Sequence, residues 1–270
     1  MSLTILSLGA GVQSSTLALM SELGQLPRLD CAIFADTGSE PKAVYEWLNW
    51  LEKRVSFPIY RVAQGNLTDD ATETRISKRS GNRYCRNTIP VFTKGISDKG
   101  QMPRTCTMNY KISPIRRKVK ELLKASNETL AEQWIGISTD EIHRMKDSRV
   151  DFIENVFPLV DLDMNRADCL QWAESHGIKK PPRSACVYCP FRSDKEWLAI
   201  KTEDPDNFEL AIKFEKDLQK SFSVVTGWKN INDPPVPFLH KSRIPLGTVE
   251  FDGENQLDLF GQECEGMCGL

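Results

Sequence analysis

The eight cysteines of the chain fall into two groups that differ in their surroundings. Cys31 lies in the apolar run LDCAIF and Cys169 in the helix-like segment NRADCLQWAESHG, so we interpret both as small core residues. The other six lie among glycine, proline or arginine residues, and without an export signal such cysteines indicate metal or redox chemistry. These six are Cys85, Cys106, Cys186, Cys189, Cys264 and Cys268.

Three of these cysteines have an arrangement that suits a metal. Cys186 and Cys189 form a C-x-x-C motif followed by proline, and Cys106 lies in a distant basic segment. Three such thiolates suit an iron–sulfur cluster, expected as [4Fe-4S], with Cys85 as the fourth ligand or with no fourth thiolate. Zinc is the main competing metal. A metal-free dithiol is the third interpretation.

A glycine-rich turn near the amino terminus has the composition of a phosphate-binding loop. The apolar run TILSL is followed by Gly9-Ala10-Gly11 and then by a helix-like segment, which predicts a strand, a tight turn and a helix. Glycines let the backbone approach an anion, and the helix presents the positive end of its dipole. No lysine follows the last glycine, so this is not a Walker A loop. A purely structural turn is the alternative.

Asp36 and Thr37 end a second predicted strand, LDCAIFAD. In open α/β sheets ligands bind outside the carboxyl ends of the strands, at the point where the strand order reverses. We therefore predict that Asp36 and Thr37 lie near a bound ligand. The alternative is that Asp36 caps the following helix.

Alternating strands and helices predict an α/β fold with a Rossmann-like parallel sheet flanked by helices. The segment after residue 65 has little periodicity up to residue 104 and is interpreted as loop-rich. Beyond Pro158 the chain is helical with irregular links, and it contains no internal repeat. The predicted strands are residues 4–8, 29–36, 58–65 and 132–138, and the predicted helices follow the first two of them and residue 113.

The length of 270 residues suits an α/β domain with a smaller lobe. We expect a nucleotide-binding α/β domain over residues 1–160, a mainly helical cysteine-containing lobe over 161–249, and a flexible acidic tail over 250–270 with Cys264 and Cys268. With 40% hydrophobic and 27% charged residues, the chain is neither membrane-embedded nor compositionally disordered. The amino-terminal segment has no basic region typical of an export signal, so we expect a cytoplasmic protein.

The net charge of -2 conceals a strong internal asymmetry. Residues 75–124 contain fourteen Lys or Arg and two acids, whereas residues 250–270 contain six acids and no base. A basic stretch of this kind is typical of a chain that meets a polyanion, so nucleic acid is a candidate partner. The alternative is a solvated basic face that acidic neighbours compensate.

Several segments, in order along most of the chain, resemble landmarks of the phosphoadenosine phosphosulfate (PAPS) reductase family. They are SLGAGVQSS, IFADTGSEPKAVYEWL, RTCTMNYKISPIRR, VFPLVDLDMNRADCLQW and SACVYCP. That family belongs to the adenine nucleotide alpha hydrolase and ATP pyrophosphatase (PP-loop) superfamily. The resemblance implies an enzyme that binds an adenine nucleotide, either PAPS or ATP, with magnesium in the case of ATP.

The resemblance also implies roles for individual residues. The segments around Cys106, Lys111 and Arg116 would face the phosphosulfate, and Arg144 and Arg149 would grip the anion through bidentate forks. His143 and His176 are assigned no catalytic role. The implied nucleotide-binding residues are Ser7, Gly9, Gly11, Gln13, Ser14, Ser15, Asp36 and Thr37.

Two departures from the family patterns bear on the reaction. ATP pyrophosphatases usually carry an aspartate in the loop, as in SGGxDS, where this chain has Gln13, which is similar to sulfonucleotide reductases. The end of the chain, ECEGMCGL, is similar to the glutamate-cysteine-glycine tail of those reductases but lacks the terminal histidine. Cys264 matches the beginning of that motif and Cys268 its ending, so both are candidate nucleophiles. Incidental thiols in a disordered terminus are the alternative.

Three functions follow from this sequence. The first is reduction of an adenylyl sulfate to sulfite, in which Cys264 or Cys268 attacks sulfur and a thiol protein such as thioredoxin or glutaredoxin releases sulfite. The second is an ATP-dependent sulfur transferase that acts on tRNA or DNA, which the basic stretch and the lone Cys106 favour. The third is a nucleotide- or nucleic-acid-binding module without catalysis. No membrane partner is expected.

Overall fold

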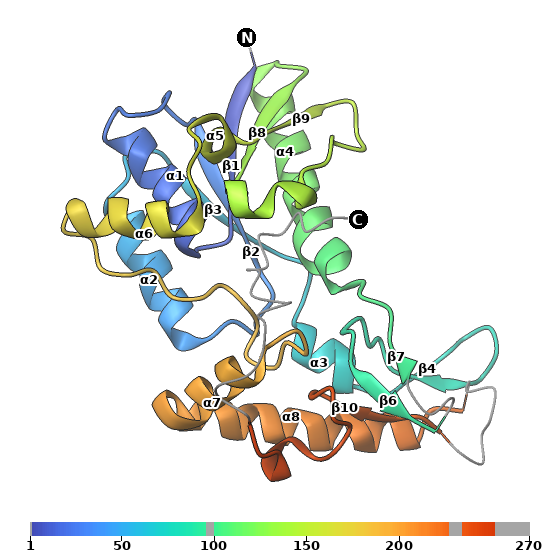
Figure 1. The fold of residues 1–270 in the computed structure, drawn as a ribbon. Coiled ribbons are helices and arrows are strands. Elements are labelled where there is room, and N and C mark those ends of the chain that lie inside the picture. Colours follow the sequence, from blue (N-terminus) through green and yellow to red (C-terminus); the bar gives the residue numbers. More distant parts are fainter. Residues whose placement is uncertain (1, 96–99, 227–233, 252–270) are drawn as a thin grey trace. The chain divides into compact units, whose positions relative to one another are not determined.

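The computed structural model describes residues 2–95, 100–226 and 234–251, which form two compact units (Figure 1). Unit 1 holds residues 2–64 and 107–185, and unit 2 holds the rest of the described chain. This division differs from the predicted boundaries at residues 160 and 249. The chain leaves unit 1 after Gln64, returns to it at Thr107 and leaves it again after Ala185. Both units are therefore discontinuous in sequence.

Unit 1 is built on a five-stranded sheet in which every neighbouring pair of strands is parallel. The strand order is β3-β2-β1-β8-β9. The chain builds the sheet outward from β1 in one direction and then returns to the other side of β1. The topological switch point therefore lies between β1 and β8. The strands are β1 (Leu3–Leu8), β2 (Cys31–Asp36), β3 (Ile59–Ala63), β8 (Ala131–Ile135) and β9 (Ile153–Val156).

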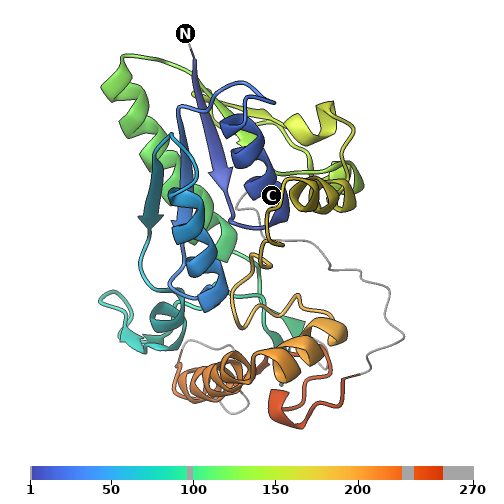
Figure 2. The ribbon, with the colours of Figure 1, turned by 90° about the vertical axis from the view of Figure 1, so that its left-hand side faces the viewer.

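Helices cover both faces of this sheet, as the sequence predicted (Figure 2). Side chains alternate between the two faces along a strand, so Leu6 and Leu8 of β1 pack on one side and Ile5 on the other. The first face is covered by α1 (Val12–Glu22), α2 (Lys42–Glu52) and α6 (Arg166–Ser175), and the second by α4 (Ser113–Ser126), which continues from the π-helical turn η1 (Thr107–Ile112).

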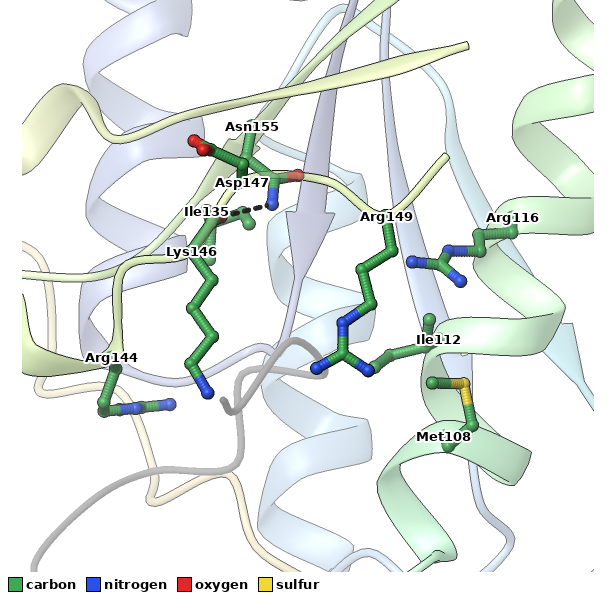
Figure 3. A pocket seen from close by; sticks show the side chains of 9 residues that line it. All are labelled: Met108, Ile112, Arg116, Ile135, Arg144, Lys146, Asp147, Arg149 and Asn155. Atoms are coloured by element: carbon green, nitrogen blue, oxygen red, sulfur yellow. Dashed lines mark hydrogen bonds between the residues drawn. The ribbon is translucent and has the colours of Figure 1, made fainter. Parts of the chain in front are cut away.

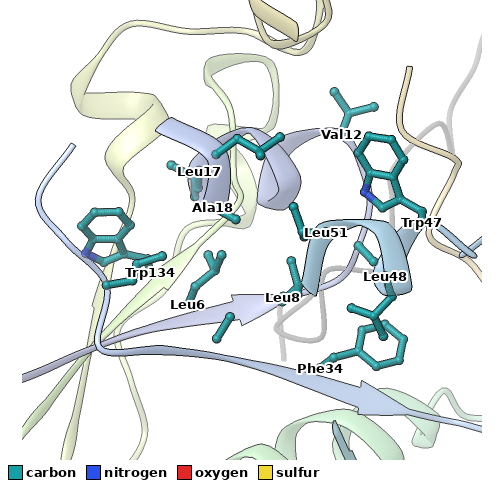
Figure 4. Packing of buried hydrophobic residues seen from close by; sticks show 14 of the residues in the cluster. Leu6, Leu8, Val12, Leu17, Ala18, Phe34, Trp47, Leu48, Leu51 and Trp134 are labelled. Atoms are coloured by element: carbon teal, nitrogen blue, oxygen red, sulfur yellow. The ribbon is translucent and has the colours of Figure 1, made fainter. Parts of the chain in front are cut away.

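The larger hydrophobic core lies under α1 and α2 (Figure 4). Leu17 of α1 and Leu48 of α2 are fully buried against Leu6 and Phe34 of the sheet. Burial of apolar area stabilises this packing by about 25 cal/mol per Å². The core fixes both helices on the sheet, and α1 begins directly after the glycine-rich turn.

Unit 2 combines helices with small antiparallel sheets. Part of it is the segment interpreted as loop-rich, which contains one short helix and four strands of two or three residues. Strands this short are below the length at which alternation is visible in a sequence. The elements are α3 (Leu67–Thr72), β4 (Arg75–Ile76), β5 (Arg83–Tyr84), β6 (Phe92–Lys94), β7 (Gly100–Gln101), α7 (Asp194–Glu203), α8 (Pro205–Ser223), β10 (Val236–Phe238) and the 3-10 turn η3 (Leu246–Thr248).

Two short elements complete the description of unit 1. Unit 1 also contains the 3-10 turn η2 (Thr139–Arg144) and the short helix α5 (Pro158–Asp161). The basic stretch of residues 75–124 is shared between the units, because unit 1 begins again at Thr107. In the described ranges, no helix has the length and apolar character needed to cross a bilayer.

Truncation of the α2 contact with the sheet should destabilise the protein. We expect Leu48→Ala to lower the free energy of unfolding by about 2–5 kcal/mol, because it leaves a cavity at a fully buried position. Leu23→Ala is the control, since this side chain after α1 is 53% exposed, and it should change stability by less than about 0.5 kcal/mol. Urea denaturation measures both, and equal losses would contradict the assigned core.

Candidate functional site

The glycine-rich loop joins the carboxyl end of β1 to the first turn of α1, at the switch point of the sheet. Gly11 precedes the helix and supplies no side-chain cap. Ala10 has φ +60°, in the left-handed region that costs a residue with a Cβ on the order of 1–3 kcal/mol. The backbone N–H of Gly9 donates to Ser14 Oγ at 3.2 Å. The loop is thus held in a sparsely populated conformation at the positive end of α1.

The hydroxyl groups of the loop are engaged in holding it. Ser15 Oγ accepts a hydrogen bond from Trp47 Nε1 at 2.8 Å, and Ser14 Oγ accepts the bond from Gly9. The Ser184 hydroxyl donates to the carbonyl oxygen of Gly9. Ser14 and Ser15 act as acceptors in these bonds and keep their O–H protons, so both these hydroxyls and the backbone amides of the loop have donors for a phosphate.

Gly136, directly after β8, lies against the backbone of the first turn of α1. A Cβ at this position would be 2.8 Å from Ser14 N and 3.2 Å from Gln13 Cβ. Such contacts are too short, so only glycine permits this close approach of β8 to α1. Our sequence reasoning missed Gly136, although a glycine within the strand-like run WIGIS is a signal of close backbone approach.

Gln13 lies in a buried polar network that reaches to Arg144. Its Oε1 accepts from Arg166 Nη1 at 2.9 Å, and its Nε2 donates to Ser138 Oγ and Glu141 Oε2, both at 3.3 Å. The other oxygen of Glu141 accepts from Arg144 Nη1. Glu141 is only 5% exposed, so this network is buried. Glu141 thus links the first turn of α1 to a predicted anion-binding arginine.

A cationic pocket lies beyond the carboxyl end of β8, where Arg144, Lys146, Arg149 and Arg116 converge (Figure 3). It encloses about 400 Å³ of empty space, its open mouth included. Within the described ranges, no ion pair joins Arg116, Lys146 or Arg149 to an acid. The lining residues are Met108, Ile112, Arg116, Ile135, Arg144, Lys146, Asp147, Arg149 and Asn155.

The two guanidinium groups of Arg116 and Arg149 repel each other in this pocket. Burial, and then the neighbouring charge of Arg149, lower the pKa of Arg116. Arg116 Nε is buried and has no hydrogen-bond partner among the described residues. A bound anion would relieve the repulsion and satisfy the donor, because arginine forks match the geometry of phosphate and sulfate. The pocket is therefore a candidate anion site.

Asn155 of β9 shapes the loop that carries the cations. Its Nδ2 donates to the carbonyl oxygen of Lys146 at 2.9 Å (Figure 3). Sequence reasoning missed both Asn155 and Lys146. The signal available for Lys146 was its place in the basic run between Arg144 and Arg149.

Asp36, at the end of β2, connects the strand to α2. Its Oδ1 accepts from the Tyr45 hydroxyl at 2.7 Å and from the backbone N–H of Gly38 at 2.8 Å. Burial, together with the hydrogen bond to Asp36, raises the pKa of Tyr45. Asp36 is therefore engaged within unit 1 and lies at the carboxyl edge of the sheet, where the sequence placed it.

Lys111 and Thr37 meet at Glu40. Lys111 Nζ lies 3.4 Å from Glu40 Oε1, and the Thr37 hydroxyl donates to the same oxygen at 3.3 Å. The side chains of Lys111 and Glu40 are 8% and 0% exposed. Two residues that the sequence placed near the ligand thus lie together, and Glu40 compensates the buried ammonium group.

The C-x-x-C turn belongs to unit 2 and is fixed by its neighbours. Cys189 N donates to Cys186 O at 3.1 Å, and Arg192 Nη2 donates to the same oxygen at 2.9 Å. The ring of Tyr188, between the two cysteines, stacks on Phe214 with centroids 3.8 Å apart. Tyr188 is thus an anchor of this turn that sequence reasoning did not single out.

The other two predicted metal ligands in the described chain also belong to unit 2. Cys106 N donates to Thr88 O at 3.0 Å, and burial raises the pKa of Cys85. Across the ranges that the structure describes, no three or more His, Cys, Asp or Glu residues are gathered as a metal site requires. The iron–sulfur site and its zinc alternative stay predictions. Cys264 and Cys268 lie outside the described residues.

Among the comparisons with known proteins, only the search of solved structures gives matches. No family model matches the chain, and no curated protein matches it. A crystal structure of phosphoadenylyl-sulfate (PAPS) reductase from Candida auris, in a phosphate complex, is similar with a TM-score of 0.41 and 12% sequence identity. The match covers 67% of this chain and 74% of that one. A likeness of this size leaves the family of the chain open.

Removal of Arg149 separates anion binding from stability. We expect Arg149→Ala to weaken binding of sulfate or phosphate about tenfold or more, because a charge-assisted contact is lost. The midpoint of thermal unfolding should stay the same or rise, since the repulsion of Arg116 is relieved. Arg117→Ala, at an exposed position of α4 outside the pocket, is the control. Calorimetry and thermal unfolding measure the two effects, and a falling midpoint would show a structural role instead.

The two core cysteines should be chemically silent. Burial raises the pKa of Cys31 and of Cys169 to about 12, so at pH 8 about one thiol in ten thousand is ionised. We expect neither to react with iodoacetamide in the folded protein and both to react in urea, as read by peptide mass spectrometry. Labelling of either residue in the native protein at the rate seen in urea would contradict its place in the core.

Proposed function

We propose that the protein is an enzyme that binds an adenine nucleotide in unit 1 and reduces an adenylyl sulfate to sulfite with thiols. The observation that carries this proposal is the cationic pocket of Arg116, Lys146 and Arg149 at the carboxyl edge of the sheet. Within the described ranges these three cations have no acidic partner, and such cations suit phosphate and sulfate groups. The ordered motifs that resemble PAPS reductases support the same choice.

In this proposal the two ends of the substrate meet different parts of unit 1. The backbone amides of the glycine-rich loop bind phosphate at the start of α1, and the cationic pocket binds a second anionic group. Glu141 connects the two, because it accepts from both Gln13 and Arg144. Glu141 is thus a positioning residue that holds Arg144 beside the pocket. Asp36 and Thr37 lie at the neighbouring strand end for contacts with the nucleoside.

The sulfur step uses the cysteines of the tail. The thiolate of Cys264 or Cys268 attacks the sulfur of the sulfonate, and an S–S bond forms as the S–O bond to the phosphate breaks. The nucleotide leaves with that electron pair, and Arg144 and Lys111 stabilise the charge of its phosphate. A second thiol, from a protein of the thioredoxin or glutaredoxin kind, then attacks the cysteine sulfur. Sulfite leaves, and the two thiols are oxidised to a disulfide while the sulfate sulfur gains two electrons.

The steps above use thiols alone. The prediction that Cys106, Cys186 and Cys189 hold a [4Fe-4S] cluster, with or without Cys85, is a separate proposal. Iron and sulfide analysis of anaerobically purified protein tests it, with zinc measured in the same sample.

A second candidate is an ATP-dependent sulfur transferase that acts on tRNA or DNA. The observation in its favour is that Cys106 and the C-x-x-C turn belong to the same unit, as a shared sulfur-handling site requires. The third candidate is a module that binds a nucleotide or nucleic acid and catalyses no reaction. Its signature is tight nucleotide binding with no product.

The test combines two assays on one anaerobic preparation. We expect sulfite release from the phosphosulfate when reduced thioredoxin is supplied, and its loss by at least about a hundredfold in Cys264→Ser/Cys268→Ser, because both proposed nucleophiles are removed. Cys169→Ala, which removes a buried thiol, is the matched control and should retain most of the activity.

The opposite results identify the other functions. AMP or pyrophosphate release from ATP that depends on added RNA or DNA, without sulfite release, would overturn the reductase proposal in favour of the sulfur transferase. Nucleotide binding with neither product would indicate the non-catalytic module. A double variant that still releases sulfite at the wild-type rate would exclude the tail as the nucleophile.

A further inference from the structure

One face of α4 carries a line of cations. Arg116, Lys120 and Lys124 recur every four residues, so they share one side of the helix and are spaced about 6 Å apart along its axis. Lys120 and Lys124 are exposed, and within the described ranges no ion pair joins either of them to an acid. The acid between them, Glu121, pairs with Lys118 at 2.7 Å. The line is therefore open to an external polyanion.

An open groove lies beside this line, before the start of β9. It contains about 650 Å³ of empty space, its mouth included, and is lined by Thr129, Arg149, Val150, Asp151 and Phe152. Lys120 Nζ lies 4.8 Å from the centroid of the Phe152 ring. The ring thus lines the groove and also contacts the cationic face of α4.

Arg149 lines both the groove and the cationic pocket, so the two adjoin at this side chain. The track that results runs from the carboxyl end of β8, past Arg149, to Phe152 and the outer turns of α4. It holds more cations than a single nucleotide needs, and among the described residues that line its pocket and groove only two are acids. The cations are Arg116, Lys120, Lys124, Lys146 and Arg149, and the acids are Asp147 and Asp151.

We propose that this track binds single-stranded nucleic acid, a function beyond the reduction of a sulfonucleotide. Phosphates of one strand would meet the cations of α4 and Arg149, and an unstacked base would lie on the Phe152 ring. Cations beside an aromatic ring in a groove are the combination that binds single strands without sequence preference. A duplex keeps its bases stacked inside and cannot use the ring.

The first test changes the outer cations and leaves the pocket intact. Fluorescence anisotropy of a labelled 20-nucleotide single strand should show about tenfold or more weaker binding to Lys120→Glu/Lys124→Glu, because two phosphate contacts are lost and reversed. Each phosphate contact to a single strand contributes about 0.7 to the steepness of the plot of log affinity against log salt concentration. The neutral variant Lys120→Gln/Lys124→Gln removes two such contacts, so this slope should become about 1.4 less steep. The matched control is Lys42→Glu in α2 combined with Lys53→Glu at the C-cap of that helix. It makes the same charge change on the other face of the sheet and should bind within about twofold of wild type.

The second test removes the aromatic surface without removing the apolar bulk. Phe152→Leu should weaken single-strand binding about fivefold or more, because a stacked base loses its partner. Its midpoint of thermal unfolding is recorded with the binding, so that a loss caused by unfolding is recognised. A folded Phe152→Leu protein that binds like the wild type would overturn the placement of a base on this ring.

The outcomes also separate this inference from the proposed reductase. Binding of duplex DNA, or of phosphatidylserine vesicles, as tight as that of the single strand and equally reduced by Lys120→Glu/Lys124→Glu would overturn it in favour of a general polyanion surface. Equal losses of single-strand binding in the α2 control would overturn the inference as well.

The Lys120→Glu/Lys124→Glu protein should keep nucleotide binding and sulfite release, since neither residue lines the pocket. A wild-type protein that binds single strands but releases no sulfite would refute the reductase and leave this inference standing.

Discussion

The close approach of Gly136 to the backbone of Ser14 is the constraint on which the candidate site depends. A Cβ at Gly136 would lie 2.8 Å from Ser14 N, so the end of β8 can reach the first turn of α1 only through glycine. This contact brings the loop after β8, with Glu141 and Arg144, to the side chain of Gln13. Without this contact, the glycine-rich loop and Arg144 would lie at separate parts of the sheet edge.

Charge is distributed in the site according to burial. Where a cation is buried, an acid compensates it, as Glu40 does for Lys111 and Glu141 for Arg144. Arg116 and Arg149 instead face each other, and within the described ranges no ion pair joins either of them to an acid. Burial, and then the charge of Arg149, lower the pKa of Arg116. Such uncompensated charge is costly for a folded chain and is typical of sites that bind an anion. Arg144 belongs to both groups, because it pairs with Glu141 and also lines the pocket.

Much of the fold was predictable because its signals are local. The strand–turn–helix order around Gly9 and Gly11 predicted β1 and α1, and the helix expected after the strand of residues 29–36 is α2. The burial of Cys31 and Cys169 also followed from their apolar neighbours. The division into units did not follow, because segments far apart in sequence, residues 65–106 and those after 185, pack together. Strands of two or three residues, such as β4 and β7, likewise leave no periodic trace.

The sequence by itself determined the α/β class, the residues at the strand ends and the basic character of the segment around α4. Composition and period are properties of neighbouring residues, so they are visible before folding. Only the tertiary structure decided which charges are compensated, because Glu40 and Lys111 or Gln13 and Glu141 meet through the packing of distant elements. It also decided that Arg149 lines both the pocket and the groove with Phe152. Pairings of that kind depend on the strand order of the sheet, which no local pattern encodes.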